Sequence, residues 1–412
     1  MEKFDGKLTE EELLRLRDAS FTEKQICKIC NFVEEYKDYL SGFSDLVGDD
    51  LVPSNLFCFN IKHIGKLLDG NPDKVLSKQG VKLRRLTAAR LIRLLAGNFI
   101  ASKQIFENRN KLLNKTDVNG KCIADNGIKL PKEPVIWASN HHFKDDIVAS
   151  VRAAKRPVYI MLGSIPAYYN TFDGILAFLV GTILINRKVK ESKRASIPKA
   201  NKAIDYGADI LWYPEAVHNK TANQLILDIY NGIYRLANEN GTKVVPVVHY
   251  MFDPTQKILT HKLNPIHTVV DDPIDLTQFS EKAGLEYLKE VISSWYYLML
   301  EKYGKISREE LFEAYRQRAI LYGVSEEELE SRPLTTAEIG ELYNLDLRST
   351  VTSYDRSIET MSNFENKSII KPEDAFADIA NIKNSKLENV FDVIQASKLV
   401  RARKYENYQK RF

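Results

Sequence analysis

The chain has 412 residues, 44% of them hydrophobic and 28% charged, with a formal net charge of +4 at pH 7. Such a length accommodates two or three domains of ~100–200 residues, and the composition is that of a folded globular protein. The first residues, MEKFDGKLTEEELL, are acidic and lack an apolar core, so no secretory signal is expected.

No apolar stretch is long enough to cross a bilayer, which needs ~18 residues or more. The nearest candidate runs from Ile175 to Ile185 and is too short. We therefore expect a cytoplasmic protein, with any membrane contact peripheral and on the inner face of the membrane.

Residues 1–115 are predicted to be a helical N-terminal region. Segments such as EKQICKICNFVEEYKDYL and RRLTAARLIRLLAGNFIASKQIF place apolar residues at a spacing near 3.6. Residues 116–133 contain Gly120, Gly127 and Pro131 among several Asn and Asp, which is typical of a linker.

Residues 134–305 show a different pattern, in which short apolar runs alternate with helical stretches. The predicted strands are PVIWAS, PVYIML, TILINR, DILWYP, KVVPVVHYM and HTVVDDPI. The helices between them are predicted in DDIVASVRAA, near 198–206 and near 225–238, and LEYLKEVISSWYYLMLEKYG closes the domain. This alternation predicts an α/β domain with a mixed, mostly buried sheet flanked by helices. Residues 306–412 are predicted to be a helical C-terminal region of unknown role.

The segment Ser139-Asn140-His141-His142-Phe143-Lys144-Asp145-Asp146 lies between the first predicted strand of this domain and a helix. Reactive groups of α/β proteins are often placed in such loops. Four residues separate His141 from Asp146, so the carboxylate can orient the imidazole while the other ring nitrogen takes a proton from a hydroxyl.

Two other interpretations of this loop remain open. One is a polar loop with two helix-capping aspartates. The other is a metal site formed by His141, His142, Asp145 and Asp146, although none of the seven histidines forms a helical H-x-x-x-H pair. We expect no bound metal.

Three further blocks follow in order. They are Gly181-Thr182-Ile183-Leu184-Ile185-Asn186-Arg187, then Trp212-Tyr213-Pro214-Glu215-Ala216, then Val244-Val245-Pro246-Val247. With Asn140-His141 and Asp146, the series resembles the four-block pattern of the glycerolipid acyltransferases, the superfamily typified by 1-acylglycerol-3-phosphate acyltransferase. The resemblance covers residues 134 to about 275, roughly a third of the chain.

The resemblance implies a fold and a mechanism. His141 would be the general base on the acceptor hydroxyl, and Asp146 would orient it. The hydroxyl would attack an acyl thioester of coenzyme A or acyl carrier protein directly. That thioester is a co-substrate, and no cofactor is expected. The chain contains no G-x-S-x-G motif, which argues against a serine acyl-enzyme.

The same resemblance implies that Arg187 holds an acceptor phosphate and that the acceptor is surrounded by Asn140, Pro214, Glu215 and His218. The chain departs from the pattern at several positions. Ala216, Val217 and His218 replace the Gly, Thr and Arg of the third block, and Asn186 stands where Asp is common. Without that Arg one expected phosphate contact is missing, which weakens the case for a phosphorylated acceptor more than the case for acyl transfer.

Two segments of the chain are strongly basic. Residues 78–111 hold nine Lys or Arg and one acid, and residues 84–106 form a basic amphipathic pattern. Such a helix can contact an anionic membrane surface, or it can pack on the domain with a solvated basic face. A second run follows Arg187 and would meet coenzyme A phosphates, an acidic acyl carrier protein or lipid headgroups, or be a solvated loop. No nucleic-acid-binding motif accompanies either run, so no nucleic acid partner is expected.

The leading functional hypothesis is therefore an acyltransferase acting on a lysophospholipid-like acceptor. One alternative is an acyltransferase whose acceptor is a non-phosphorylated lipid or metabolite. Another is a catalytically silent lipid-binding protein, against which the intact His141 and Asp146 argue.

Overall fold

The computed structural model describes residues 3–47, 55–87, 90, 103–113, 115, 117–122, 124–125, 127–142, 146–163, 165–170, 177–216, 226–251, 265–303, 325 and 327. Predictions for almost all of residues 306–412 and for most of the basic segment 84–106 therefore lie outside the described residues. Asp145 and His218 also lie outside them.

The described residues form a seven-stranded mixed sheet in the order β1-β7-β6-β2-β5-β3-β4. The strands are β1 (Gln104–Phe106), β2 (Ile136–Ser139), β3 (Val158–Leu162), β4 (Thr182–Leu184), β5 (Asp209–Trp212), β6 (Val244–Met251) and β7 (Ile266–Val270). All neighbouring strands pair in parallel except β6 and β7, which are antiparallel. The predicted α/β class and the mixed, buried sheet are confirmed.

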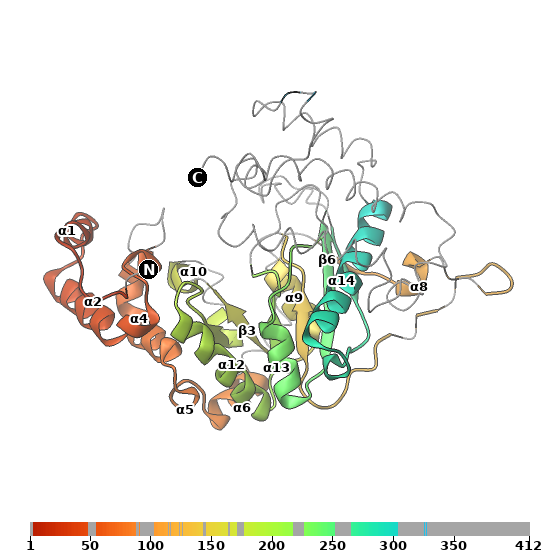
Figure 1. Ribbon diagram of the computed structural model, residues 1–412, viewed down its shortest axis with the longest axis horizontal. Helices are drawn as coiled ribbons and strands as arrows, with labels where there is room; N and C mark the ends of the chain where they lie inside the picture. Colours follow the sequence, from red (N-terminus) through yellow and green to blue (C-terminus); the bar gives the residue numbers. More distant parts are fainter. Residues whose placement is uncertain are drawn as a thin grey trace.

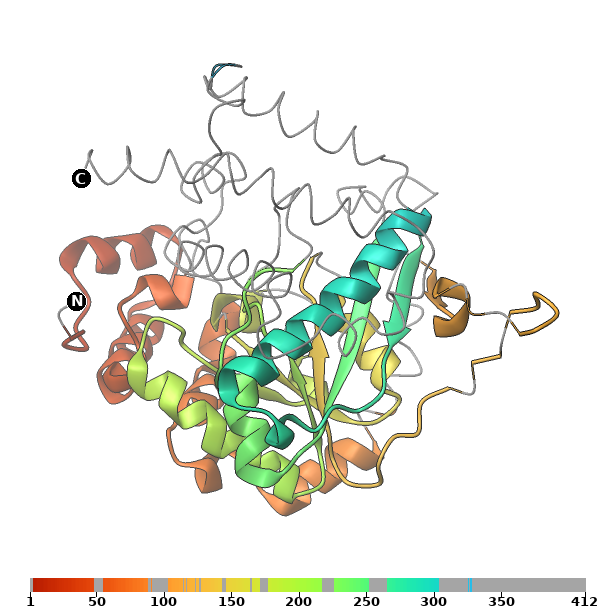
Figure 2. The ribbon, with the colours of Figure 1, turned by 45° about the vertical axis from the view of Figure 1, so that its right-hand side comes forward.

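Helices cover both faces of this sheet, as Figures 1 and 2 show. The helices that follow β1 include α8 (Arg109–Leu112), α9 (Asp146–Ala154), α10 (Ile165–Asn170), α12 (Lys190–Asp205), α13 (Gly232–Asn240) and α14 (Glu281–Tyr303), with a 3₁₀ turn at Leu276–Gln278. Figure 2 shows α14 running across the front of the sheet.

Side chains of the central strands alternate between two cores, because successive residues of a strand point to opposite faces. Ile136 and Ala138 pack in the core shared with α12, α13 and α14, whereas Trp137 packs in the core shared with α9. Strand β2 is fully buried on both faces, which explains its unbroken apolar sequence.

The N-terminal region is helical up to Leu86, and it packs beside the strand β4 edge of the sheet (Figure 1). Its helices are α1 (Glu10–Asp18), α2 (Glu23–Glu35), α3 (Ser44–Val47), α4 (Asn55–Leu68), α5 (Pro72–Val75) and α6 (Lys78–Leu86), with a 3₁₀ turn at Lys37–Tyr39. Capping boxes at Thr9 and Thr22 begin α1 and α2.

A buried lysine joins the N-terminal region to the α/β domain. Lys199 of α12 is fully buried, and its Nζ donates to the carbonyl oxygens of Leu67 at 2.7 Å and Leu68 at 3.4 Å. These carbonyls end α4, where a cation also interacts favourably with the helix dipole. The N-terminal helices and the sheet therefore share one continuous core.

Three sequence predictions about elements are corrected by the structure. Residues 104–106 were predicted to be helical but form β1, whose partner β7 lies more than 150 residues away in the chain. Helix α12 begins at Lys190 rather than near Pro198, which is exposed inside the helix, so water can hydrate the carbonyl that lacks an N–H partner. Helix α13 begins at Gly232, later than predicted.

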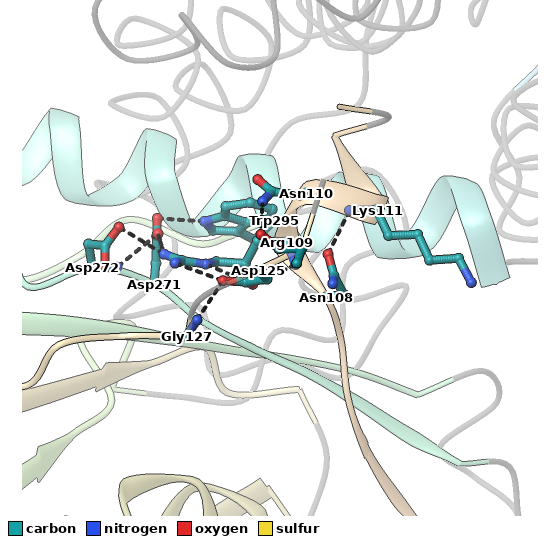
Figure 3. Close-up of polar contacts among 10 residues, drawn as sticks. Asn108, Arg109, Asn110, Lys111, Asp125, Gly127, Asp271, Asp272 and Trp295 are labelled. Atoms are coloured by element: carbon teal, nitrogen blue, oxygen red, sulfur yellow. Dashed lines mark hydrogen bonds and ion pairs between the residues drawn. The ribbon is translucent and has the colours of Figure 1, made fainter. Parts of the chain in front are cut away.

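A cluster of charged side chains connects the predicted linker to the segment that follows β7 (Figure 3). Arg109, at the start of α8, contacts Asp125 at 3.2 Å, Asp271 at 3.0 Å and Asp272 at 2.9 Å. The indole of Trp295 on α14 donates to Asp271 at 2.6 Å. Burial opposes ionisation of Asp125, but its hydrogen bonds from Arg109 lower its pKa overall.

Among the helices within the described residues, none combines the length and apolarity that a membrane crossing requires.

Candidate active site

The predicted pair of His141 and Asp146 is assembled where β2 ends and α9 begins. Asp146 is the first residue of α9, where a carboxylate suits the helix dipole, and its side chain is completely buried. Its Oδ2 lies 2.9 Å from Nδ1 of His141 and accepts the backbone N–H of His142 at 3.0 Å. Because a carboxylate only accepts, this contact favours the tautomer with the proton on Nδ1. Nε2 is then the basic nitrogen.

Glu215 connects the third sequence block to this loop. One carboxyl oxygen accepts the backbone N–H of His141, and the other accepts the backbone N–H of Leu227, both at 2.8 Å. Burial raises the pKa of the Glu215 carboxyl to about 8, against the opposite effect of the two N–H bonds. The resemblance implied that Glu215 lies beside the acceptor, whereas in the structure its two carboxyl oxygens hold the backbone of His141 and Leu227.

Asn140 holds the start of the same loop against β6. Its amide nitrogen donates to the carbonyl of His249 at 2.8 Å, and its amide oxygen accepts the N–H of His249 at 2.7 Å. The side chain is 1% exposed. These contacts differ from the predicted substrate contact, because both ends of the amide are used to join two backbone segments.

A series of buried, hydrogen-bonded side chains, which was not predicted from the sequence, packs against the His141 imidazole through Tyr213. The ring of Tyr213 packs against His141 with centroids 4.4 Å apart, and its hydroxyl donates to Ser150 at 3.1 Å. The Ser150 hydroxyl lies 2.8 Å from Nε2 of His249, whose Nδ1 lies 2.9 Å from Thr268. Burial lowers the pKa of His249 to about 4, so this imidazole is neutral. The one sequence signal was a histidine inside the apolar run VVPVVHYM.

Arg187 reaches the third block from the end of β4. Its side chain is exposed and lies against the backbone of Gly163, where a Cβ atom would be 2.8 Å from its Nε. Its guanidinium donates to the carbonyl of Ala216. Pro214 is buried in the same turn. The second and third blocks therefore meet in space, with Arg187 at the surface.

Ala216 occupies a backbone conformation that suits glycine. Its φ is +60°, in the left-handed region that Cβ disfavours by ~1 kcal/mol or more. Ala216→Gly is therefore expected to stabilise the fold by about 0.5–1 kcal/mol, the relief of strain being partly offset by the freer unfolded chain.

Urea denaturation measures this change in the free energy of unfolding. Ala237→Gly, inside helix α13, is the control and should destabilise by ~1 kcal/mol, because no strain is relieved there. Equal destabilisation by the two substitutions would contradict the strain at residue 216.

No metal-ligand group is formed by three or more His, Cys, Asp or Glu side chains within the part of the chain that the structure describes. That part includes His141, His142 and Asp146 but not Asp145.

Comparison with known proteins defines the class of protein. Residues 116–250 match the family model of the acyltransferases, and this range includes all four blocks. This match identifies residues 116–250 as an acyltransferase domain, and it agrees with the resemblance of the four blocks to the glycerolipid acyltransferases.

A solved structure with a similar chain is the 1-acyl-sn-glycerophosphate (LPA) acyltransferase PlsC from Thermotoga maritima. The two chains share 16% sequence identity, with 57% of this chain and 83% of that chain covered and a TM-score of 0.35. No curated protein matches the chain.

Proposed function

We propose that the protein transfers a fatty acyl group from acyl-CoA or acyl carrier protein to a hydroxyl of a lysophospholipid-like acceptor. The observation that carries the proposal is the 2.9 Å contact between His141 Nδ1 and the buried carboxylate of Asp146. The match of residues 116–250 to the acyltransferase family model supports the reaction, and the resemblance of the four sequence blocks to the glycerolipid acyltransferases supports the class of acceptor.

The proposed reaction needs one proton acceptor and no covalent enzyme intermediate. Nε2 of His141 removes the proton of the acceptor hydroxyl while the hydroxyl oxygen attacks the thioester carbonyl carbon. The carbon–sulfur bond then breaks, and the leaving thiolate takes the same proton from the imidazolium. Asp146 stabilises the imidazolium through Nδ1–H. Acyl ester and free thiol are the products.

The acceptor phosphate is assigned to Arg187. A guanidinium carries five N–H donors in a planar fork, so the contact with the Ala216 carbonyl is compatible with a bidentate phosphate contact. The exposed Lys188 and Lys190 follow it directly and add positive charge.

Arg187→Lys is expected to raise the KM for a phosphorylated acceptor about tenfold, because an ammonium cannot reproduce the bidentate fork. Steady-state kinetics with matched phosphorylated and dephosphorylated acceptors measures the effect. Arg194→Lys, at an exposed position of α12, is the control and should change neither KM.

The same measurement separates the alternative acceptors. An enzyme that prefers the dephosphorylated acceptor, and whose KM values are unchanged by Arg187→Lys, would support the non-phosphorylated acceptor suggested by His218. The proposed chemistry of His141 would survive that result. A silent lipid-binding protein would show no acyl transfer with any acceptor.

A lipid-like acceptor implies peripheral contact with the inner face of the membrane. Part of the predicted basic amphipathic segment is described, and Arg84 lies over the ring of Phe178 with 5.7 Å between its Cζ and the ring centroid. Leu83 and Phe178 are 63% and 40% exposed. This pairing of a cation with exposed apolar side chains supports such contact.

A further inference from the structure

The N-terminal helical region contacts the segment that carries the proposed phosphate-binding arginine. The turn that follows α2 and the short helix α3 pack beside α12 and α10, which flank the end of β4. From this turn and helix, the carbonyl of Tyr39 and the carboxylate of Asp45 face Asn186, the residue before Arg187.

Asn186 is 5% exposed, and its side chain links two parts of the chain. The amide nitrogen donates to Asp45 at 2.5 Å and to the Tyr39 carbonyl at 3.1 Å. The amide oxygen accepts the backbone N–H of Lys188 at 3.0 Å. One side of the amide is thus bound to the N-terminal region and the other shapes the turn around Arg187.

Asp45 is held firmly enough to act as an anchor. It is 8% exposed, and it accepts hydrogen bonds from both the backbone N–H and the hydroxyl of Ser41. The ammonium of Lys188 lies 3.7 Å from the same carboxylate. The N-terminal region therefore contacts residues 186 and 188, on both sides of Arg187.

The chemistry at position 186 requires a donor. An aspartate there would bring a second carboxylate against Asp45 and would leave the Tyr39 carbonyl without its N–H partner, both of which are unfavourable in a buried site. An asparagine supplies two donors to the N-terminal region and one acceptor to its own turn.

From these contacts we infer that the N-terminal helical region positions the acceptor-binding segment Asn186–Lys188 through the contact between Asp45 and Asn186. Asp45 and Asn186 are positioning residues that act through Arg187. The inference rests on the proposed function for what the segment binds, and on the structure alone for the contact.

The test compares the wild type with Asp45→Asn, Asn186→Asp and the double variant that exchanges the two groups. Asn186→Asp should raise the KM for the phosphorylated acceptor about tenfold and leave kcat within about twofold. The double variant should recover most of the KM, because the amide at position 45 now donates to the carboxylate at 186. Recovery is incomplete, since the Tyr39 carbonyl still lacks a donor.

Asp73→Asn is the matched control. It removes an ion pair between the N-terminal region and α12, the 2.6 Å contact of Asp73 with Lys202. Lys202 lies near the C-terminal end of α12, away from the turn that contains residue 186. KM should be unchanged in this variant. A KM that rises equally in Asp73→Asn and Asn186→Asp would overturn the inference, because loosening of the whole region would explain both.

Hydrogen exchange of the full-length proteins gives a readout that needs no activity. The amides of residues 186, 188 and 189 are all hydrogen-bonded in the turn, to Ser192, Asn186 and Asn186. They should exchange faster in Asn186→Asp and recover in the double variant. Unchanged exchange would overturn the inference whatever the kinetics, as would a double variant with the KM of Asn186→Asp. If the wild type shows no acyl transfer that depends on His141, the proposed function is refuted. Hydrogen exchange would still test the contact between Asp45 and Asn186.

Discussion

Replacing His141 with alanine is expected to lower kcat for acyl transfer by at least ~10²-fold and up to ~10⁴-fold, the usual contribution of a general base. The imidazole is the group that removes the hydroxyl proton, and its Nδ1 lies 2.9 Å from the carboxylate that stabilises the imidazolium. The fold should persist, because the backbone N–H of residue 141 keeps its bond to Glu215. Transfer of a labelled acyl group in single-turnover experiments measures the loss.

His142→Ala is the control for this prediction. Its ring stacks on Tyr296 with centroids 4.4 Å apart, so its loss should affect packing more than the chemical step. Asp146→Asn should also lower kcat sharply, because an amide can hold the opposite imidazole tautomer. An inactive His142→Ala together with an active His141→Ala would show that the assignment of the two histidines is reversed.

The central strands could be predicted from the sequence because their signals are local. PVIWAS, DILWYP and KVVPVVHYM are apolar at nearly every position, as strands buried on both faces must be, and they form β2, β5 and β6. Strand β1 lacks such a signal. Its three residues follow a helical pattern, and only pairing with β7 makes them a strand.

The candidate site divides in the same way. His141 and Asp146 are close in sequence, so a turn between strand and helix was enough to predict their contact. The bonds of Glu215 and Asn140 to backbone groups at distant positions required the fold. Ala216 is a third case. The sequence shows an alanine where the family pattern has glycine, but only the structure shows that the backbone at this position has a positive φ.

The second large effect concerns stability. Arg109 is the cation of a cluster that contains three carboxylates, and its side chain is 16% exposed. Arg109→Ala would leave Asp125 and Asp271 partly buried without their cation, next to each other's charge. Removing one partner of a buried ion pair costs ~3–5 kcal/mol, and we expect the low end because the side chain of Asp272 is 67% exposed. Urea denaturation should therefore show a loss of about 3 kcal/mol.

Two further variants identify the cause of that loss. Arg235→Ala removes an exposed pair with Glu239 on α13 and should cost less than ~1 kcal/mol. Burial already raises the pKa of Asp271 with Arg109 present, so its charge is unfavourable once the cation is gone. Adding Asp271→Asn to Arg109→Ala should then restore about 1–2 kcal/mol, because an amide keeps an acceptor for the Trp295 indole without the charge. If the double variant is less stable than Arg109→Ala, lost packing of the arginine side chain, rather than uncompensated charge, explains the effect.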